Sequence, residues 1–380
     1  MNNFNFYNPT RIIFGKNTIP KIGKEISRRG YKKILILAGS GSIKSNGVYE
    51  ESIESLKKST VQWIEHWGVR PNPVLSHAEE GINFIRENKL EAILAIGGGS
   101  VIDEAKSIAA GYYMDNLWTA FEQKTNITKA LPIFSILTLS GTCSEMDPFA
   151  VLTNDKELKK WNIGGDALFP TLSIIDPSVQ MSLPWHQTVN GGIDAISHIM
   201  EFYFMGIEEE VSIALDESLI RTLIKCLDQL QENQKDYNSR ANLAWSATLA
   251  LNGISGVGLK GGDWAVHRIE HSISALYPEV AHGAGLAVIF PAWIKYMQNE
   301  NPPQFQRWAG NLWNTTTVDE AVELMKAKYR SWGAPVSLRD LGIERGKIPE
   351  LAGNTMMFGA LGQLRDLTED DVINIMNIAY

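Results

Sequence analysis

The apolar positions in the first half of the chain gather in short continuous runs. Four such runs end in glycine, serine or threonine, or at an Asp-Pro step, and they cover residues 34–38, 92–96, 132–137 and 172–175. Stretches of helical length lie between them. Short apolar runs separated in this way are typical of parallel strands that are buried on both faces. The pattern therefore predicts an open α/β sheet, whose ligands bind at the carboxyl ends of the strands.

The second half of the chain has no comparable strand signal. After about residue 180, stretches of helical length follow one another, with breaks at glycine, proline or asparagine. The expected helices cover residues 189–203, 209–231, 238–256, 263–276, 304–313, 318–332 and 369–379. We therefore predict an α/β dinucleotide-binding domain over residues 1–180 and an all-helical domain over 181–380, with the boundary between Pro177 and Pro184.

Composition and charge restrict the expected partners. The 380 residues include 35 Lys and Arg against 43 Asp and Glu, a formal net charge of -8. Nucleic acids and anionic membranes normally need a basic surface, so neither is an expected partner. No apolar run approaches the roughly 18 residues of a transmembrane helix, and the start does not resemble a signal peptide. The only cysteines are Cys143 and Cys226, which excludes a disulfide framework and favours a cytoplasmic protein.

Three of the apolar runs end in turns rich in glycine and hydroxyl side chains. Gly97-Gly98-Gly99-Ser100 leads into an expected helix over 101–110, where glycines let a phosphate approach and helix amides favour an anion. Asp103, one turn further on, could cap the loop or meet a ribose or amide group. Gly39-Ser40-Gly41-Ser42 and Ser140-Gly141-Thr142 end two other runs. One such turn could be an ordinary strand-to-helix connection, but three together favour a dinucleotide site.

The first of these turns bears on which nucleotide binds. An acidic side chain in this turn would repel a 2′-phosphate and accept hydrogen bonds from a free ribose hydroxyl. The turn carries no acidic side chain. Lys44 follows just after the turn, either as a cation for that phosphate or as an ordinary solvated lysine. The turn therefore favours NADP(H) over NAD(H).

Four of the seven histidines fall within one stretch of the second half, together with a carboxylate. Asp194 and His198 are four residues apart on an expected helix, so they share one face, and His267 and His271 repeat that spacing. One carboxylate and three imidazoles suit Zn(II) or Fe(II). Either pair alone is more often structural, but the whole arrangement favours a metal site. The spacing leaves the fourth ligand open between His271 and His282, and the histidine that does not bind could relay a proton.

At these residues the sequence resembles the iron-containing (group III) alcohol dehydrogenases. Within that family it looks most similar to the butanol dehydrogenases and broad aldehyde reductases. The similarity runs nearly from end to end. The segments that carry it are Phe4 to Gly15, Gly97 to Asp103, Thr138 to Glu145, Asp176-Pro177, Asn190 to Ala195, Gly262 to His267 and His282 to Ala287.

The resemblance implies an architecture and a metal site. It implies a Rossmann-like parallel-sheet domain followed by an all-α metal-binding domain, as in dehydroquinate-synthase-like proteins, and a homodimer or larger homo-oligomer. The metal ligands that it implies are Asp194, His198, His267 and His282. His271 is then left near the nicotinamide and the substrate.

The resemblance also implies a cofactor site. Gly97 to Ser100 would hold the pyrophosphate, Thr138 and Thr142 would line the site, and Lys160 would approach the nicotinamide. This branch of the family usually reads Gly-Gly-Gly-Ser at the first turn, where this chain has Gly39-Ser40-Gly41-Ser42.

We therefore expect metal-dependent hydride transfer between NADP(H) and a primary alcohol or aldehyde, with short to medium aliphatic aldehydes such as butanal as substrates. Four apolar residues flank the motifs and suit a substrate pocket, although each could equally belong to the core: Phe149, Val151, Leu259 and Trp264.

Three other functions fit the sequence less well. A dehydroquinate-synthase-like or glycerol-phosphate dehydrogenase activity needs clustered basic residues for a phosphate, yet only Lys260 and Arg268 are basic between 241 and 290. A metal-dependent hydrolase leaves the three glycine turns unexplained. A nucleotide-binding protein without catalysis would bind the cofactor without a metal.

Overall fold

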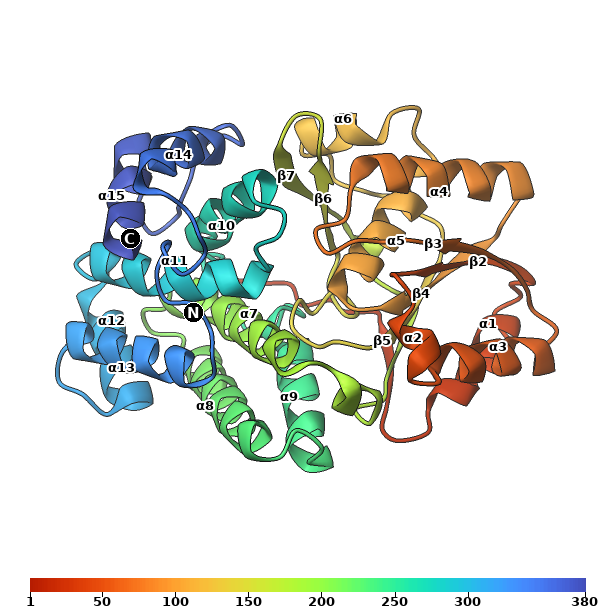
Figure 1. The fold of residues 1–380 in the computed structure, drawn as a ribbon, viewed down its shortest axis with the longest axis horizontal. Coiled ribbons are helices and arrows are strands. Elements are labelled where there is room, and N and C mark those ends of the chain that lie inside the picture. Colours follow the sequence, from red (N-terminus) through yellow and green to blue (C-terminus); the bar gives the residue numbers. More distant parts are fainter. The chain divides into compact units, whose positions relative to one another are not determined.

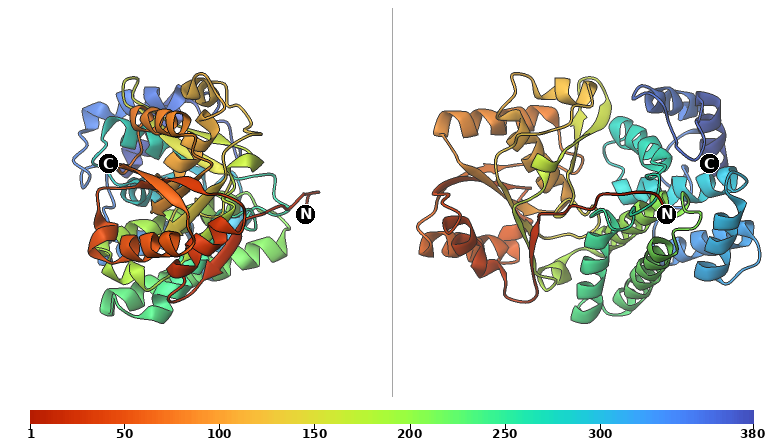
Figure 2. Two further views of the ribbon diagram at one scale, coloured as in Figure 1. Left: turned by 90° about the vertical axis from the view of Figure 1, so that its right-hand side faces the viewer. Right: turned by 180° about the vertical axis from the view of Figure 1, so that it is seen from behind.

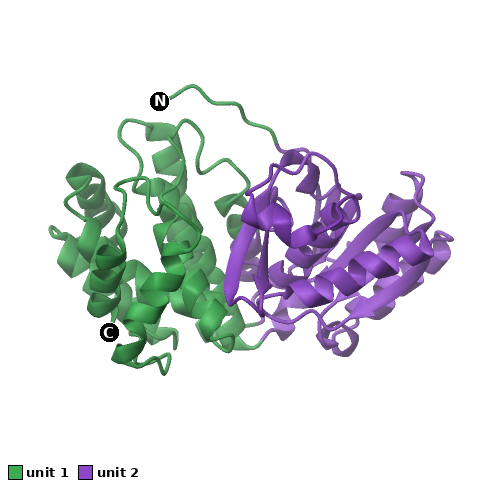
Figure 3. Cartoon of the chain, turned by 90° about the horizontal axis from the view of Figure 1, so that it is seen from above, with its two compact units in different colours: residues 1–7, 184–234, 245–380 green, residues 8–183, 235–244 purple.

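The computed structural model describes residues 1–380, which form two compact units (Figure 3). Unit 1 joins residues 1–7, 184–234 and 245–380, whereas unit 2 joins residues 8–183 and 235–244. Each unit therefore takes a short segment from the other half of the sequence.

Unit 2 is built on a six-stranded parallel sheet with the strand order β1-β8-β5-β4-β2-β3 (Figure 1). The strands are β1 (Arg11–Phe14), β2 (Lys33–Ala38), β3 (Gln62–Trp67), β4 (Ala92–Gly97), β5 (Ile133–Leu137) and β8 (Leu172–Ile175). The register pairs Ala38 with Ile96 and Gly97 with Leu137. Since all the strands are parallel, the three glycine turns that follow β2, β4 and β5 all lie at the carboxyl ends of the strands.

The four predicted strands are confirmed as β2, β4, β5 and β8, but β1 and β3 were missed. These two strands form the edges of the sheet, and neither is fully buried. The β3 sequence, Gln62 to Trp67, mixes polar and aromatic residues, so it contains no continuous apolar run. An edge strand needs no such run because it is not covered on all sides.

Helices cover both faces of the sheet (Figures 1 and 2). They are α1 (Ile22–Ser27), α2 (Ser42–Ser45), α3 (Val48–Lys58), α4 (Leu75–Asn88), α5 (Gly99–Gly111) and α6 (Leu117–Glu122). Side chains alternate between the faces of a strand, and β2 shows this directly. Leu35 and Leu37 belong to the apolar core with α4 to α6, whereas Ile34 and Ile36 belong to the core with α1 to α3.

A two-stranded antiparallel hairpin in unit 2 was not predicted. It consists of β6 (Phe149–Asn154) and β7 (Lys159–Gly164). The residues between its strands, Asp155 to Leu158, contain neither an Asn-Gly nor an Asp-Gly step, so the usual hairpin signal is missing. The hairpin matters because β7 carries Lys160.

After β8 the chain is helical. The helices are α7 (Trp185–Tyr203), α8 (Glu210–Glu232), α9 (Tyr237–Ala250), α10 (Ala265–Leu276), α11 (His282–Met297), α12 (Pro302–Trp313), α13 (Val318–Ser331), α14 (Ile348–Met356) and α15 (Glu369–Ala379). Four short 3-10 helices complete the fold: η1 (Ile19–Lys21), η2 (Asp166–Leu168), η3 (Val179–Ser182) and η4 (Arg345–Lys347). None of the helices combines the length and the apolar character needed to span a bilayer.

The predicted helices of this half are confirmed, with one correction and two additions. The helix expected to reach residue 256 ends at Ala250, because Gly253 and Gly258 adopt positive φ angles of 99° and 77° that a helix does not allow. Helices α11 and α14 were missed. Twelve of the 16 residues of α11 are buried, so its sequence lacks the polar face that marks an amphipathic helix.

Candidate functional site

A carboxylate and several imidazoles converge inside unit 1. Helix α7 carries Asp194 and His198, α10 carries His267, and α11 begins at His282. Oδ1 of Asp194 lies 3.6 Å from Nδ1 of His198, 3.8 Å from Nε2 of His267 and 3.6 Å from Nε2 of His282. The ring of His198 stacks on that of His267, with centroids 4.6 Å apart. The structure therefore brings together the two motifs that were singled out by their spacing.

The donor atoms of this cluster fit a metal ion. Oδ1 of Asp194 and Nε2 of His267 are buried and have no hydrogen-bond partner, which is costly for polar atoms unless something else satisfies them. Asp194, His267 and His282 offer ligand atoms that all lie within 4.8 Å of one another. Ligands of one Zn(II) ion lie about 2.0–2.2 Å from it, so donor atoms must be spaced in this way.

The electrostatics of the cluster favour positive charge. Burial alone would raise the pKa of Asp194, but His198, His267 and His282 lower that pKa to about 2. Burial alone would lower the pKa of His267, but its carboxylate neighbours Asp194 and Glu201 raise it to about 9. The cluster therefore attracts a cation, whether a proton or a metal ion.

Two buried glutamates orient the imidazole rings, and neither was predicted from the sequence. Glu201 Oε1 accepts a hydrogen bond from Nδ1 of His267 at 2.7 Å, and Glu270 is hydrogen-bonded to Nδ1 of His282. A carboxylate at Nδ1 fixes the tautomer, so the lone pair of Nε2 faces a metal ligand position. A signal was present: Glu201 lies three residues after His198, and Glu270 three after His267, on the same helix faces.

Two glycines of α11 allow His282 to reach the cluster. A Cβ atom on Gly283 would lie 2.1 Å from the backbone oxygen of Asn190 on α7, and one on Gly285 would lie 2.7 Å from Cγ of Glu270 on α10. Only glycine permits such close contact between helices. The His-Gly-Ala-Gly sequence therefore places the first turn of α11 against both neighbouring helices.

His271 belongs to a different group from Asp194. It lies with Glu270 and His282, and its ring centroid is 5.5 Å from that of His282. Of the two histidines between which the spacing could not decide, His282 is the one whose Nε2 lies near the Asp194 carboxylate. His271 is half-buried on α10, one turn from His267.

The second and third glycine turns of unit 2 are joined to each other. The backbone amide of Thr138 donates to the carbonyl of Gly97 at 2.9 Å. A Cβ atom on Gly99 would lie 2.2 Å from Oγ1 of Thr142, so the glycine lets that side chain pack against the start of α5. Ser140 is buried and exchanges hydrogen bonds with Gln180. Packing alone thus requires glycine at position 99, whatever else the turn binds.

The first turn shows a different need for glycine. Gly41 has a positive φ of 118°, and a Cβ atom built on it would meet nothing within 4 Å. Ser40 is exposed, and Ser42 begins α2. The turn is therefore open, and its glycine is required by the backbone conformation rather than by crowding.

The sequence left Asp103 either to cap the loop or to meet a ribose or amide group. In the structure its carboxylate caps the loop. Its carboxylate accepts hydrogen bonds from the Ser144 hydroxyl at 2.5 Å and from the Val151 amide at 3.1 Å. Burial raises the pKa of Asp103, and the charges of Lys106 and Lys160 lower it in part. The carboxylate therefore fixes the loop after β5 and the start of the hairpin to α5.

Lys44 is exposed, and its ammonium group lies over an aromatic ring. Its Nζ lies 4.1 Å from the ring centroid of Trp67, a cation–π arrangement. Burial alone would raise the pKa of Glu65, but hydrogen bonds from Tyr49, Trp67 and Trp63 and the charge of Lys44 lower it. Lys44 thus stands beside the first turn with an aromatic ring and a carboxylate as neighbours.

Comparisons with known proteins point to the same family in both halves of the chain. A family described as iron-containing alcohol dehydrogenase matches residues 9–177, and the C-terminal part of the Fe-containing alcohol dehydrogenase family matches residues 188–380. The NADH-dependent butanol dehydrogenase A of Clostridium acetobutylicum is 38% identical over 392 aligned positions, which cover 100% of both chains. The NADPH-dependent aldehyde reductase YqhD of Escherichia coli is 32% identical and covers 97% of each chain. A crystal structure of NADH-dependent butanol dehydrogenase A from Thermotoga maritima superposes with a TM-score of 0.98 at 48% identity, over 100% of this chain and 99% of that one.

Proposed function

The chain belongs to the iron-containing alcohol dehydrogenase family, and we propose that it transfers a hydride between NADP(H) and short to medium aliphatic aldehydes such as butanal. Membership makes it a metal-dependent oxidoreductase of alcohols and aldehydes that uses a nicotinamide cofactor. The observation that carries the proposal is the buried cluster around Asp194, in which Oδ1 of Asp194 and Nε2 of His267 have no hydrogen-bond partner.

The residues that would hold the metal ion, Fe(II) or Zn(II), are Asp194, His198, His267 and His282. When bound, the ion supplies a Lewis acid for the substrate oxygen. Glu201 and Glu270 keep the imidazole rings of His267 and His282 oriented, so the donor atoms need no rearrangement during the reaction.

The nucleotide would be held by unit 2. We assign the pyrophosphate to Gly97 through Ser100, because these residues include the N-terminus of α5, where backbone amides and the helix dipole favour an anion. The remaining residues that we assign to the cofactor are Gly39, Ser40, Gly41, Ser42, Lys44, Asp103, Thr138, Ser140, Thr142 and Lys160. Of these, Asp103 acts through the loop that it fixes, because both of its oxygens already accept hydrogen bonds from the protein.

The direct test is an aldehyde-reduction assay on apoprotein that is reloaded separately with Fe(II) and with Zn(II). Consumption of NADPH or NADH in the presence of butanal, followed by absorbance, should require one of the metals. Oxidation of neither nucleotide with either metal, despite tight nucleotide binding, would overturn the choice of substrate and direct the search to phosphorylated compounds.

We expect replacement of His271 by alanine to leave the metal content unchanged and to lower kcat by about a hundredfold, which is typical of losing a general acid. The proposed role of His271 is to pass a proton to the substrate oxygen, so the pH profile of kcat should also change. Metal analysis and kcat over a range of pH check this, with the exposed His186→Gln as a control. A His271→Ala protein without metal would instead make His271 a ligand.

We expect replacement of Lys44 by alanine to lower kcat/KM for NADPH by about tenfold while leaving kcat/KM for NADH nearly unchanged, because the 2′-phosphate loses one charge-assisted contact. The absence of a carboxylate in the first turn supports NADP(H), and the relatives carry names with either nucleotide. The exposed Lys57→Ala on α3 is the matched control. An equal loss with both nucleotides would contradict a role for Lys44 in choosing between them.

A further inference from the structure

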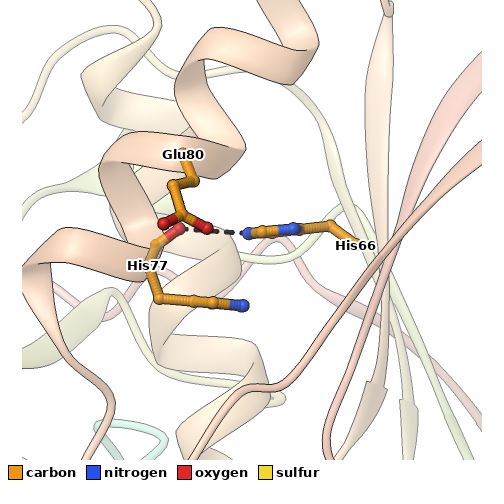
Figure 4. A group of neighbouring side chains, drawn as sticks. All are labelled: His66, His77 and Glu80. Carbon is orange, nitrogen blue, oxygen red and sulfur yellow. Dashed lines mark hydrogen bonds between the residues drawn. The ribbon is translucent and has the colours of Figure 1, made fainter.

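A second histidine and carboxylate group lies in unit 2 (Figure 4), and none of its members has a role in the proposed chemistry. His66 on β3 and His77 and Glu80 on α4 offer atoms within 4.8 Å of one another. The two imidazole rings stack with centroids 4.0 Å apart and an interplanar angle of 11°. His66 is buried, His77 is half-buried and Glu80 is exposed.

The hydrogen bonds of this group do not suit a metal ion. His77 Nε2 is bonded to the backbone oxygen of Trp67 at 3.0 Å, and His77 Nδ1 is bonded to Glu104 Oε1 at 2.5 Å. His66 Nε2 is bonded to the backbone oxygen of His77 at 3.1 Å. A metal ligand needs the lone pair of a neutral imidazole, and both nitrogens of His77 already have partners. The group needs another explanation.

The protons that this group holds explain its arrangement. A backbone carbonyl can only accept, so Nε2 of His77 must carry a hydrogen. A second hydrogen lies between Nδ1 of His77 and the carboxyl group of Glu104. Glu104 is fully buried, and its other oxygen has no hydrogen-bond partner. Loss of the shared proton would therefore leave a buried negative charge opposite an imidazole lone pair, which is strongly unfavourable.

The hydrogen bond from His77 holds the chain segment that follows β3. Gly68, next to Trp67, has a positive φ of 112°, and a Cβ atom added to it would lie 3.3 Å from Nε2 of His77. The amide of Gly68 donates to the carbonyl of Ala38 at 3.1 Å, at the end of β2. The segment of residues 68–74 is thus fixed at its start between His77 and the strand that leads into the first glycine turn.

The same segment contacts two groups that we assigned to the nucleotide. The Gly68 amide also donates a hydrogen bond to the carbonyl of Gly39 at 3.4 Å. Further along, Asn72 Oδ1 accepts a hydrogen bond from Nζ of Lys160 at 2.9 Å. A shift of this segment would therefore disturb the contact with Gly39 and the hydrogen bond between Asn72 and Lys160 at the same time.

We propose that His77 and Glu104 are positioning residues that hold residues 68–74 in the conformation needed for nucleotide binding, and that the segment loosens when the pair loses its shared proton. The inference rests on the proposed function, because it takes Gly39 and Lys160 as parts of the nucleotide site. Glu104 lies on α5, one turn after Ser100, so the pair also connects the segment to the helix that follows the pyrophosphate turn.

The direction of the pH effect follows from the groups around His77. The hydrogen bond to Glu104 raises the pKa of His77, and the charge of Glu80 adds to this, whereas burial lowers it. Burial raises the pKa of Glu104, and burial together with the neighbouring His77 lowers the pKa of His66. The folded protein therefore keeps a proton that the unfolded chain releases near pH 6.5. The contribution of the pair is complete below that pH and is lost as the pH rises through the raised pKa of His77.

Two variants separate the proton from the hydrogen bonds. In Glu104→Gln, the amide group can donate to Nδ1 of a neutral His77, and Nε2 still donates to the Trp67 carbonyl, so both bonds survive without a shared proton. In His77→Ala, both bonds are lost. His186→Gln, which changes an exposed histidine of unit 1, is the matched control.

The experiment measures the Kd of NADH by fluorescence titration from about pH 6.5 to about pH 9, above the ordinary histidine pKa. NADH is used because it has no 2′-phosphate that titrates in this range. For the wild type and His186→Gln we expect the Kd to rise by about tenfold across the range, the effect of losing one charge-assisted hydrogen bond. For Glu104→Gln the Kd should stay constant across the range. For His77→Ala the Kd should be high at every pH, because NADH binding is weak throughout.

Hydrogen exchange of the Gly68 and Val69 amides provides a readout that does not depend on nucleotide. Relative to Glu104→Gln, exchange in the wild type should accelerate at high pH. Two outcomes would overturn the inference while the proposed function stands. One is that His77→Ala binds NADH as tightly as the wild type does, and the other is that the Kd of Glu104→Gln depends on pH as the wild-type Kd does. A wild type that binds neither NADH nor NADPH at any pH would overturn both.

Discussion

Replacement of Asp194 by asparagine is expected to remove the metal and to lower kcat for aldehyde reduction by about a thousandfold or more, because Lewis-acid stabilisation is worth several kcal/mol. Asparagine keeps the shape of the side chain but not its negative charge. Three imidazoles would then surround a neutral amide, whereas in the wild type they surround a carboxylate whose pKa they lower to about 2. Metal analysis of the purified protein and kcat measured with the metal in excess provide the test.

A conservative surface change provides the control for this experiment. Asp319 is exposed in the first turn of α13, and Asp319→Asn should leave metal content and kcat unchanged. If Asp194→Asn kept both the full metal content and the full rate, the assignment of the metal site would be wrong.

Replacement of Gly283 by alanine is the second change from which we expect a large effect. The added Cβ would lie 2.1 Å from the backbone oxygen of Asn190, so α11 must move away from α7. Such overpacking costs about 1–3 kcal/mol or more. Because α11 begins at His282, the shift also moves a proposed ligand, and we expect metal affinity to fall by at least about a hundredfold, the upper end for losses in the surroundings of a metal ligand.

Gly310 offers a matched comparison for Gly283. It lies inside α12, and a Cβ atom on it would meet nothing within 4 Å. Gly310→Ala should therefore stabilise the protein by about 0.5–1 kcal/mol, since alanine loses less backbone entropy in a helix. Chemical denaturation and metal titration of both variants check the pair of predictions. Unchanged metal affinity in Gly283→Ala would show that close contact of α11 with α7 does not position His282.

The fold could be predicted where burial leaves a mark on the sequence. The four interior strands are continuous apolar runs, and most of the later helices have a polar and an apolar side. The pattern fails at both extremes of burial. Strand β3 is too exposed to form an apolar run, and α11 is too buried to show a polar side. In these two elements tertiary position, rather than local preference, determines the sequence pattern.

The candidate metal site could be anticipated further than its surroundings. Spacing alone related Asp194 to His198 and His267 to His271, because the helical repeat converts four residues into one turn. Spacing could not decide whether His271 or His282 lies near Asp194, since the choice depends on how closely α11 approaches α7. It also did not identify Glu201 or Glu270, because their spacing from His198 and His267 becomes informative only when the imidazoles that they contact, His267 and His282, are known.

The proposed metal ligands all come from helices of unit 1, and the proposed nucleotide residues all come from unit 2. A ligand that binds only the folded state adds its binding free energy to the stability of the structure that holds it. Bound metal would therefore add to the stability of the fold that unit 1 provides, and bound nucleotide would add to that of unit 2.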